Sequence, residues 1–225
     1  MTYSIFDIAG PVMVGPSSSH TAGACKIGQY ARALFHKTPK KVTFYLHGSF
    51  GEVYVGHATD RALLGGVMKF KTSDERIKDS FKIAKEKKID YEFVVKDLGA
   101  KYHPNTVEVV LEDGDYKMSV IGSSIGGGMI EIVKINDFDV MLKGQAGKYL
   151  SIVVCHENNP ELLLELRARL KALNFEVMEI ESTIYKDRAL SIFSLEGKRI
   201  TLHEVVELEK TKGVDFIRSL TKLEK

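Results

Sequence analysis

The last third of the chain carries the pattern that most restricts how this sequence can fold. Strand and helix signals follow one another there in the order β-α-β-β-α-β, within about 75 residues. The predicted elements are a strand at 149–154, a helix at 161–173, strands at 176–184 and 189–195, a helix at 202–208 and a strand at 214–217. This is the order of the split βαβ unit of ferredoxin-like domains.

The residues before it predict an α+β domain with an antiparallel sheet. Helices are expected at 21–35, 57–68 and 77–87, and strands at 42–46, 91–95, 106–111 and 129–135. Asp113-Gly114 separates two alternating runs and predicts a hairpin. Gly126-Gly127-Gly128 interrupts the strand pattern, which indicates either a bulge or a close backbone approach to a ligand or another chain. The character of the sequence changes near Gly144–Gly147, so we predict two domains, at 1–143 and 148–225.

Composition excludes several classes of protein. The net charge is +2, and basic and acidic residues are interleaved along the chain, so we expect neither a nucleic-acid nor a membrane partner. No apolar run approaches the roughly 20 residues that span a bilayer, and the N-terminus lacks the pattern of a signal peptide. We therefore expect a cytoplasmic protein. Cys25 and Cys155 are isolated, so neither a disulfide framework nor a self-contained metal site is expected.

One loop concentrates groups that can bind an anion or transfer a proton. It runs from Gly15 to Gly23 and precedes the first predicted helix. Its five central residues carry hydroxyl or imidazole groups: Ser17, Ser18, Ser19, His20 and Thr21. Hydroxyls at a helix N-terminus either cap the helix or hold an anion, and a histidine titrates near neutral pH. The Gly-Pro and Ala-Gly pairs that flank the loop favour the second interpretation.

Four segments together give the chain a family resemblance. They are Gly15–Gly23, Leu46–Phe50 with Gly56–Ala62, His103–Thr106, and Ser124–Gly128. With them the chain resembles the β subunit of the bacterial iron–sulfur L-serine dehydratases over essentially its whole length. Its first domain is similar to the allosteric substrate-binding domain of some phosphoglycerate dehydrogenases. Its last third looks like an ACT domain, a regulatory and assembly module.

The resemblance implies a lyase that converts L-serine to pyruvate and ammonia. Such enzymes use a 4Fe–4S cluster rather than pyridoxal phosphate, and cysteines of an α subunit hold the cluster. With two isolated cysteines, this chain is expected to need that partner. Homodimerisation through the ACT or β domain is also implied. In ACT domains an effector binds after the first strand, but His156–Glu161 lacks a glycine after its proline. Effector binding and a purely structural role therefore both stay open.

The resemblance also implies which residues form the site. The expected catalytic residues are His20, His57 and His103, and the expected substrate-binding residues are Ser17, Ser18, Ser19, Thr21 and Asn105. Structural roles stay open for two of them, since His57 could cap a helix and His103 could shape the turn before Pro104. The other histidines, His36, His47, His156 and His203, are not expected to be catalytic, and all but His47 are expected at the surface. Cys25 is expected in the core.

The same residues disfavour two other classes of enzyme. A serine hydrolase is disfavoured because adjacent Ser19 and His20 side chains diverge and no Gly-x-Ser-x-Gly elbow is present. A metal hydrolase lacks a His-Glu-x-x-His or similar pair of ligands. The remaining alternative is a non-catalytic amino-acid-sensing subunit, in which the serine-rich loop binds an amino-acid carboxylate allosterically.

Overall fold

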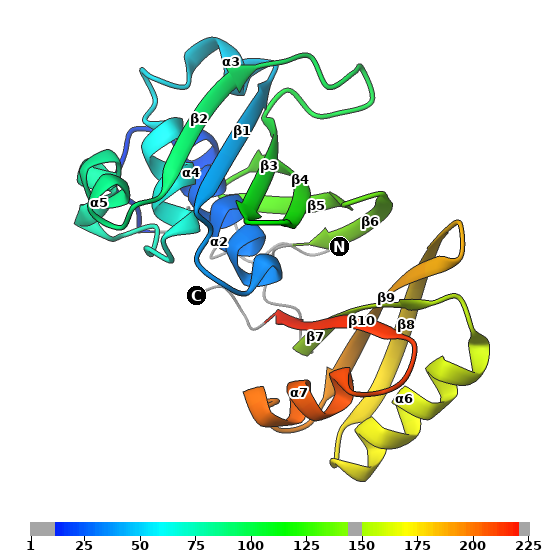
Figure 1. The fold of residues 1–225 in the computed structure, drawn as a ribbon. Coiled ribbons are helices and arrows are strands. Elements are labelled where there is room, and N and C mark those ends of the chain that lie inside the picture. The colour runs from blue at the N-terminus through cyan, green and yellow to red at the C-terminus, as the bar shows by residue number, and fades with distance from the viewer. Residues whose placement is uncertain (1–11, 144–149, 221–225) are drawn as a thin grey trace. The chain divides into compact units, whose positions relative to one another are not determined.

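The structure is a computed structural model that describes residues 12–143 and 150–220 (Figure 1). Contacts divide the described chain into two compact units, 12–136 with 140–143 and 137–139 with 150–220. The predicted boundary at Gly144–Gly147 lies outside the described residues, as does Tyr149, the expected start of a strand. Each unit has its own sheet and its own helices.

The first unit is built on a six-stranded sheet with the order β2-β1-β3-β4-β5-β6. Its strands are β1 (Lys41–His47), β2 (Asp90–Val95), β3 (Thr106–Asp113), β4 (Tyr116–Gly126), β5 (Met129–Ile135) and β6 (Phe138–Lys143). Strands β3 and β4 form the predicted hairpin at Asp113-Gly114. The glycines at 126–128 form the β4–β5 turn, where the register shifts between Ser124 and Gly126. That irregularity agrees with the expected bulge.

The expectation of a purely antiparallel sheet is wrong at one edge. Strand β1 runs antiparallel to β3 but parallel to β2, with Phe44 opposite Phe93. The connection between the two parallel strands contains several helical segments, and such a crossover returns the chain to the same end of the sheet. The sequence shows the strand at 91–95 but does not show its direction.

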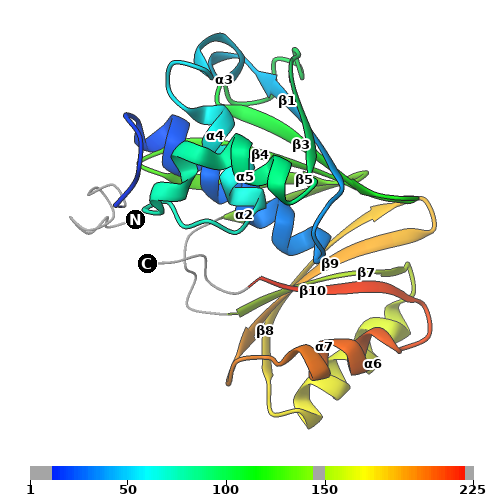
Figure 2. The same ribbon diagram turned by 60° about the vertical axis from the view of Figure 1, so that its left-hand side comes forward.

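Helices cover one face of this sheet, as both ribbon views show (Figures 1 and 2). The helical segments are η1 (Ser18–Gly23, a π-helix), α2 (Ala24–Phe35), α3 (Ser49–Val53), α4 (Thr59–Val67), η2 (Glu75–Asp79, a 3₁₀-helix) and α5 (Ser80–Glu86). The helix expected at 57–68 begins at Thr59 rather than at His57. Helix α3 was not expected from the sequence. None of the described helices is long and apolar enough to cross a bilayer.

Two glycines let α2 and α4 pack backbone against backbone. A Cβ built on Gly28 would lie 2.3 Å from the carbonyl oxygen of Leu63, and one built on Gly66 would lie 2.0 Å from that of Cys25. Both distances are far below van der Waals contact, so no side chain fits at either position. The close approach fixes the N-terminal part of α2, and with it the residues just before this helix.

The second unit has the element order that the sequence predicts. Its elements are β7 (Leu150–Glu157), α6 (Pro160–Ala172), β8 (Glu176–Tyr185), β9 (Arg188–Glu196), α7 (Leu202–Glu209) and β10 (Val214–Leu220). The four strands form an antiparallel sheet in the order β10-β7-β9-β8. Helices α6 and α7 cover the same face of this sheet (Figures 1 and 2). Beneath them Ile152, Val154, Leu166, Phe193 and Ile217 are buried together.

The expectation that His156 lies at the surface is wrong. Only 1% of this residue is exposed, and its Nε2 lies 2.7 Å from Ser191 Oγ while its Nδ1 lies 2.6 Å from the carbonyl oxygen of Glu157. Side chains alternate along a strand, so His156 points to the same face as Ile152 and Val154. His36 and His203 are exposed, as expected.

Candidate functional site

Two of the expected catalytic histidines lie side by side in the first unit. The ring centroids of His20 and His57 are 5.0 Å apart with 35° between the ring planes. His20 comes from η1, and His57 from the turn just before α4, so they are 37 positions apart in sequence. Both side chains are half-buried. The packing of α2 on α4 therefore brings together two motifs that the sequence shows as separate.

Hydrogen bonds within the serine-rich loop hold His20 in place. Ser17 is the N-cap of η1: its Oγ accepts the backbone N–H of His20 at 3.2 Å, and its carbonyl oxygen accepts that of Thr21 at 2.9 Å. The hydroxyl of Thr21, which is fully buried, donates to the carbonyl oxygen of His57 at 3.0 Å. Thr21 therefore joins the two histidine segments directly.

The N-terminus of α3 completes the surroundings of His20. Nε2 of His20 lies 3.1 Å from Ser49 Oγ. The ring of Phe50 packs edge-on against the imidazole, with 5.4 Å between the ring centroids. The preceding Gly48 has φ +54°, and a Cβ there would lie 2.8 Å from the carbonyl oxygen of Pro104. Only glycine combines this backbone conformation with this close approach. Ser49 was not expected in the site, although it lies within the motif at 46–50.

The loop that contains His103 and Asn105 connects two sides of the site through its backbone. The carbonyl oxygen of Pro104 accepts the N–H of Phe50 at 3.3 Å, and that of Asn105 accepts the N–H of Ser124 at 2.9 Å. His103 is exposed, and its Nδ1 accepts the N–H of Asn105 at 3.0 Å. No contact joins the ring of His103 to the two paired histidine rings within the described residues.

Strand β4 brings a buried hydroxyl against the start of the long helix. A Cβ on Gly23 would lie 2.1 Å from Ser124 Oγ, so the glycine makes room for this side chain. Ser124 is fully buried, and its hydroxyl has no hydrogen-bond partner among the described residues. Next to it, Lys26 Nζ donates to the carbonyl oxygen of Gly128 at 2.7 Å and ties the glycine turn to α2. Burial lowers the pKa of Lys26.

Several polar groups of these segments remain available to a ligand. The hydroxyls of Ser18 and Ser19 and the side-chain amide of Asn105 are half-buried and make no hydrogen bond to another described residue. Ser18 and Ser19 adjoin His20 in η1, and Asn105 lies in the loop whose backbone is hydrogen-bonded to Phe50 and Ser124. Hydroxyl and amide donors of this kind suit a carboxylate.

The paired rings influence the charge that His20 can carry. Burial is the larger cause that lowers the pKa of His20 below its ordinary value, and the neighbouring His57 is the second. His20 is therefore neutral at neutral pH. A neutral imidazole can both donate and accept a hydrogen bond.

The chain's cysteines do not fit an iron–sulfur cluster. Cys25 is buried, and its Sγ donates to the carbonyl oxygen of Phe70 at 3.4 Å. Burial and the nearby Asp215 raise the pKa of Cys155 to about 12, whereas metal ligation requires a thiolate. The two thiols belong to different units. Within the described ranges, no three His, Cys, Asp or Glu side chains are grouped to hold a metal ion.

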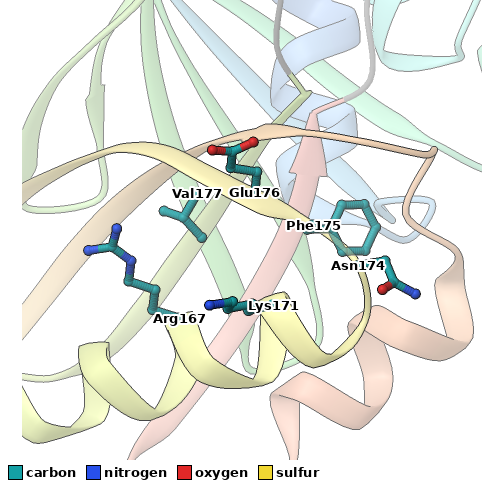
Figure 3. Close-up of a pocket in the computed structure, with 6 residues that line it drawn as sticks. All are labelled: Arg167, Lys171, Asn174, Phe175, Glu176 and Val177. Carbon is teal, nitrogen blue, oxygen red and sulfur yellow. The ribbon is translucent and has the colours of Figure 1, made fainter.

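An open groove of the second unit lies between α6 and β8 (Figure 3). Arg167 and Lys171 project from α6, and Phe175, Glu176 and Val177 lie across from them. The groove shares no residue with the loop at 156–161, where an effector is expected.

Comparison with known proteins identifies the first unit. Residues 4–134 match the family described as the serine dehydratase beta chain. The chain belongs to the serine dehydratase β-chain family. It is 40% identical over 212 residues to the "Probable L-serine dehydratase, beta chain" of Bacillus subtilis (strain 168), with 94% of each chain covered. It is 39% identical over 222 residues to the "L-serine dehydratase, beta chain" of Peptoniphilus asaccharolyticus, which covers 92% of this chain and 99% of that one.

All the candidate site residues fall within the segment that matches the serine dehydratase β-chain family. The second unit lies beyond that segment, and the alignments to both relatives cover 94% and 92% of the chain, so they take in most of this unit. Among solved structures, the C-terminal domain of the MgtC protein from Mycobacterium tuberculosis matches 32% of this chain at 18% identity with a TM-score of 0.27, too low for a conclusion about the fold.

Proposed function

We propose that this chain is the β subunit of an iron–sulfur L-serine dehydratase and forms one wall of an active site shared with an α subunit. The observation that carries this proposal is the pairing of His20 with His57 beside unpartnered polar side chains, inside the family segment. The relatives' names as β chains of L-serine dehydratase support L-serine as substrate and an α chain as partner.

The cysteines of this chain do not fit a 4Fe–4S cluster, so we assign the cluster to the α subunit and give this chain only binding and proton handling. Conversion of L-serine to pyruvate and ammonia needs removal of the α-proton and departure of the β-hydroxyl, after which the aminoacrylate hydrolyses. Ser18 and Ser19 donate to the substrate carboxylate, and Asn105 supplies a neutral amide donor. His57 and His20 handle the proton. Thr21, Ser17 and His103 position these groups through the contacts described above.

The second unit is proposed as an ACT-like module for assembly of the β chain with itself or for response to an effector. The four-stranded sheet with two helices on one face supports this role. In this proposal the groove between α6 and β8 has no assigned function.

The test is to co-express this chain with its α partner under anaerobic conditions and to measure pyruvate release from L-serine. We expect activity in the pair and none in either chain alone. His57→Ala should lower kcat by about 10²–10⁴-fold, the range of a well-placed acid–base group, and Ser18→Ala should raise KM. His203→Ala, an exposed change in the second unit, is the matched control. If both site variants leave turnover intact and alter only the response to an added amino acid, the chain is the amino-acid-sensing subunit instead.

A further inference from the structure

The hydrogen bonds at Ser17 indicate which ring nitrogen of His20 carries the hydrogen. Ser17 Oγ already accepts the backbone N–H of His20 at 3.2 Å and lies 3.4 Å from His20 Nδ1. The hydroxyl hydrogen of Ser17 has no other acceptor among the described residues. That hydrogen is available to Nδ1, and in the arrangement where Nδ1 accepts it the ring hydrogen lies on Nε2.

Ser49 lies where that hydrogen points. Its Oγ is 3.1 Å from His20 Nε2, and it stands at the first position of α3. The backbone at this point is fixed by Gly48, which packs against Pro104, and by the N–H of Phe50, which donates to the carbonyl oxygen of Pro104. The phenyl ring of Phe50 closes the same side of the imidazole. A rigid acceptor thus meets one nitrogen of a half-buried ring.

We propose that Ser49 is a positioning residue that accepts the Nε2–H of His20 and holds this ring in one tautomer and one orientation. Ser49 lies outside the set of residues expected to bind substrate or transfer protons. Its effect on catalysis rests on the proposed function, whereas its effect on the His20 ring does not.

The neighbouring ring shows why this matters. Nδ1 of His57 lies 3.4 Å from the carbonyl oxygen of Val53 and donates to it, so Nε2 of His57 carries the free lone pair. No described residue hydrogen-bonds to that nitrogen. With both nitrogens of His20 engaged by Ser17 and Ser49, the free lone pair of the two rings is the one on Nε2 of His57. The acceptor, His57, is then the member of the pair that takes a proton.

The direct test is ¹⁵N NMR of the imidazole nitrogens in the full chain, above the pKa of His20. In the unaltered chain, the His20 signals should show hydrogen on Nε2 and none on Nδ1. In Ser49→Ala the ratio of this tautomer to the other should fall about fivefold, as expected for loss of one neutral hydrogen bond. Ser49→Thr keeps the hydroxyl and should restore the ratio. Ser73→Ala, an exposed serine in a loop, is the matched control.

Unchanged His20 signals in a folded Ser49→Ala chain would overturn the proposal, and so would an equal change in Ser73→Ala. A second measurement separates it from the proposed function. In the complex with the α chain, Ser49→Ala should lower kcat by up to about fivefold, the limit set by the tautomer ratio, with little change in KM. If the tautomer ratio changes and kcat does not, Ser49 still positions His20, and it is the catalytic role of the pair that fails.

Discussion

At the scale of single residues, the site depends on side chains that hold other side chains. His20 contacts groups from three separate segments: Ser17 in its own loop, Ser49 at the start of α3, and His57 before α4. Two of those partners are themselves hydrogen-bonded to the backbone, Ser17 to the N–H of His20 and His57 to the carbonyl oxygen of Val53. A loss at any of them therefore changes the histidine pair without removing a histidine.

The first prediction concerns the pKa of His20. The nearby His57 is the second of two causes that lower this pKa, because a second imidazolium close by disfavours protonation of the first. His57→Gln should therefore raise the pKa of His20 towards its ordinary value, although burial still lowers it. NMR titration of His20 measures the change. His103→Gln, which alters an exposed ring without contact to His20, should leave this pKa where it is, and an equal shift in both variants would contradict the prediction.

At the scale of elements, sequence patterns located most helices and strands but not their directions or partners. The strand at 91–95 was visible from its residues, while its parallel pairing with β1 depends on a long crossover that periodicity does not report. The surface position predicted for His156 was based on its polar side chain. Its spacing of two from Val154 in the same strand, which predicts that both point inward, was the better guide. Ser49 was missed because its orientation depends on the packing of Gly48 against Pro104, which is distant in sequence.

The second prediction concerns the contact between α2 and α4. Gly66→Ala would push a methyl group into the carbonyl of Cys25, so the helices must separate. We expect a loss of about 1–3 kcal/mol in the free energy of unfolding, the usual cost of overpacking. Thermal unfolding followed by circular dichroism measures it. Gly114→Ala is a comparison in which a Cβ meets no neighbour, so its cost is limited to the positive φ of that turn.

The third prediction concerns the capping box of α7. The Oγ of Thr201 accepts the N–H of Glu204, whose carboxylate accepts the N–H of Thr201 in return. The hydrogen bond from Lys198 is the largest cause that lowers the pKa of Glu204 to about 2, and the backbone N–H of Thr201 is the second. The folded state thus favours the ionised carboxylate of Glu204. The stability that this carboxylate contributes is fully present above pH 4.5, the ordinary pKa of a glutamate, and is lost as the pH falls towards 2. Thr201→Ala should cost about 1 kcal/mol at neutral pH.

Urea unfolding of Glu204→Gln across pH 2 to 7 separates these effects. The difference in stability from the unaltered chain should be largest above pH 4.5 and should shrink towards pH 2. A difference that stays constant over this range would show that the carboxylate charge has no part in the cap.

At the scale of the whole molecule, the chain is two compact units with separate cores. The candidate site uses only residues of the first unit, and the family segment ends within that unit. The second unit has a complete core of its own, formed by α6 and α7 on one face of a four-stranded sheet. Units that are built in this way commonly unfold separately.

The fourth prediction follows from this division. Calorimetry of the full chain should resolve two unfolding transitions. Gly66→Ala should lower the midpoint of one, and Thr201→Ala should lower the midpoint of the other, because these residues belong to different units. A single transition that either substitution shifts by the same amount would show that the units unfold as one.

The π-helical turn at Ser18–Gly23 has a consequence for how the chain tolerates changes in length. A π-turn holds one residue more than an α-turn, and such turns are frequent at functional sites. Deletion of Ser19 would allow a regular helix from the cap into α2, with a gain in local stability. It would also leave His20 two positions after Ser17 instead of three, and residues two apart on a helix do not face each other. The cap at Ser17 and the imidazole of His20 would no longer face each other, so the spacing of this loop is as much a part of the site as its side chains.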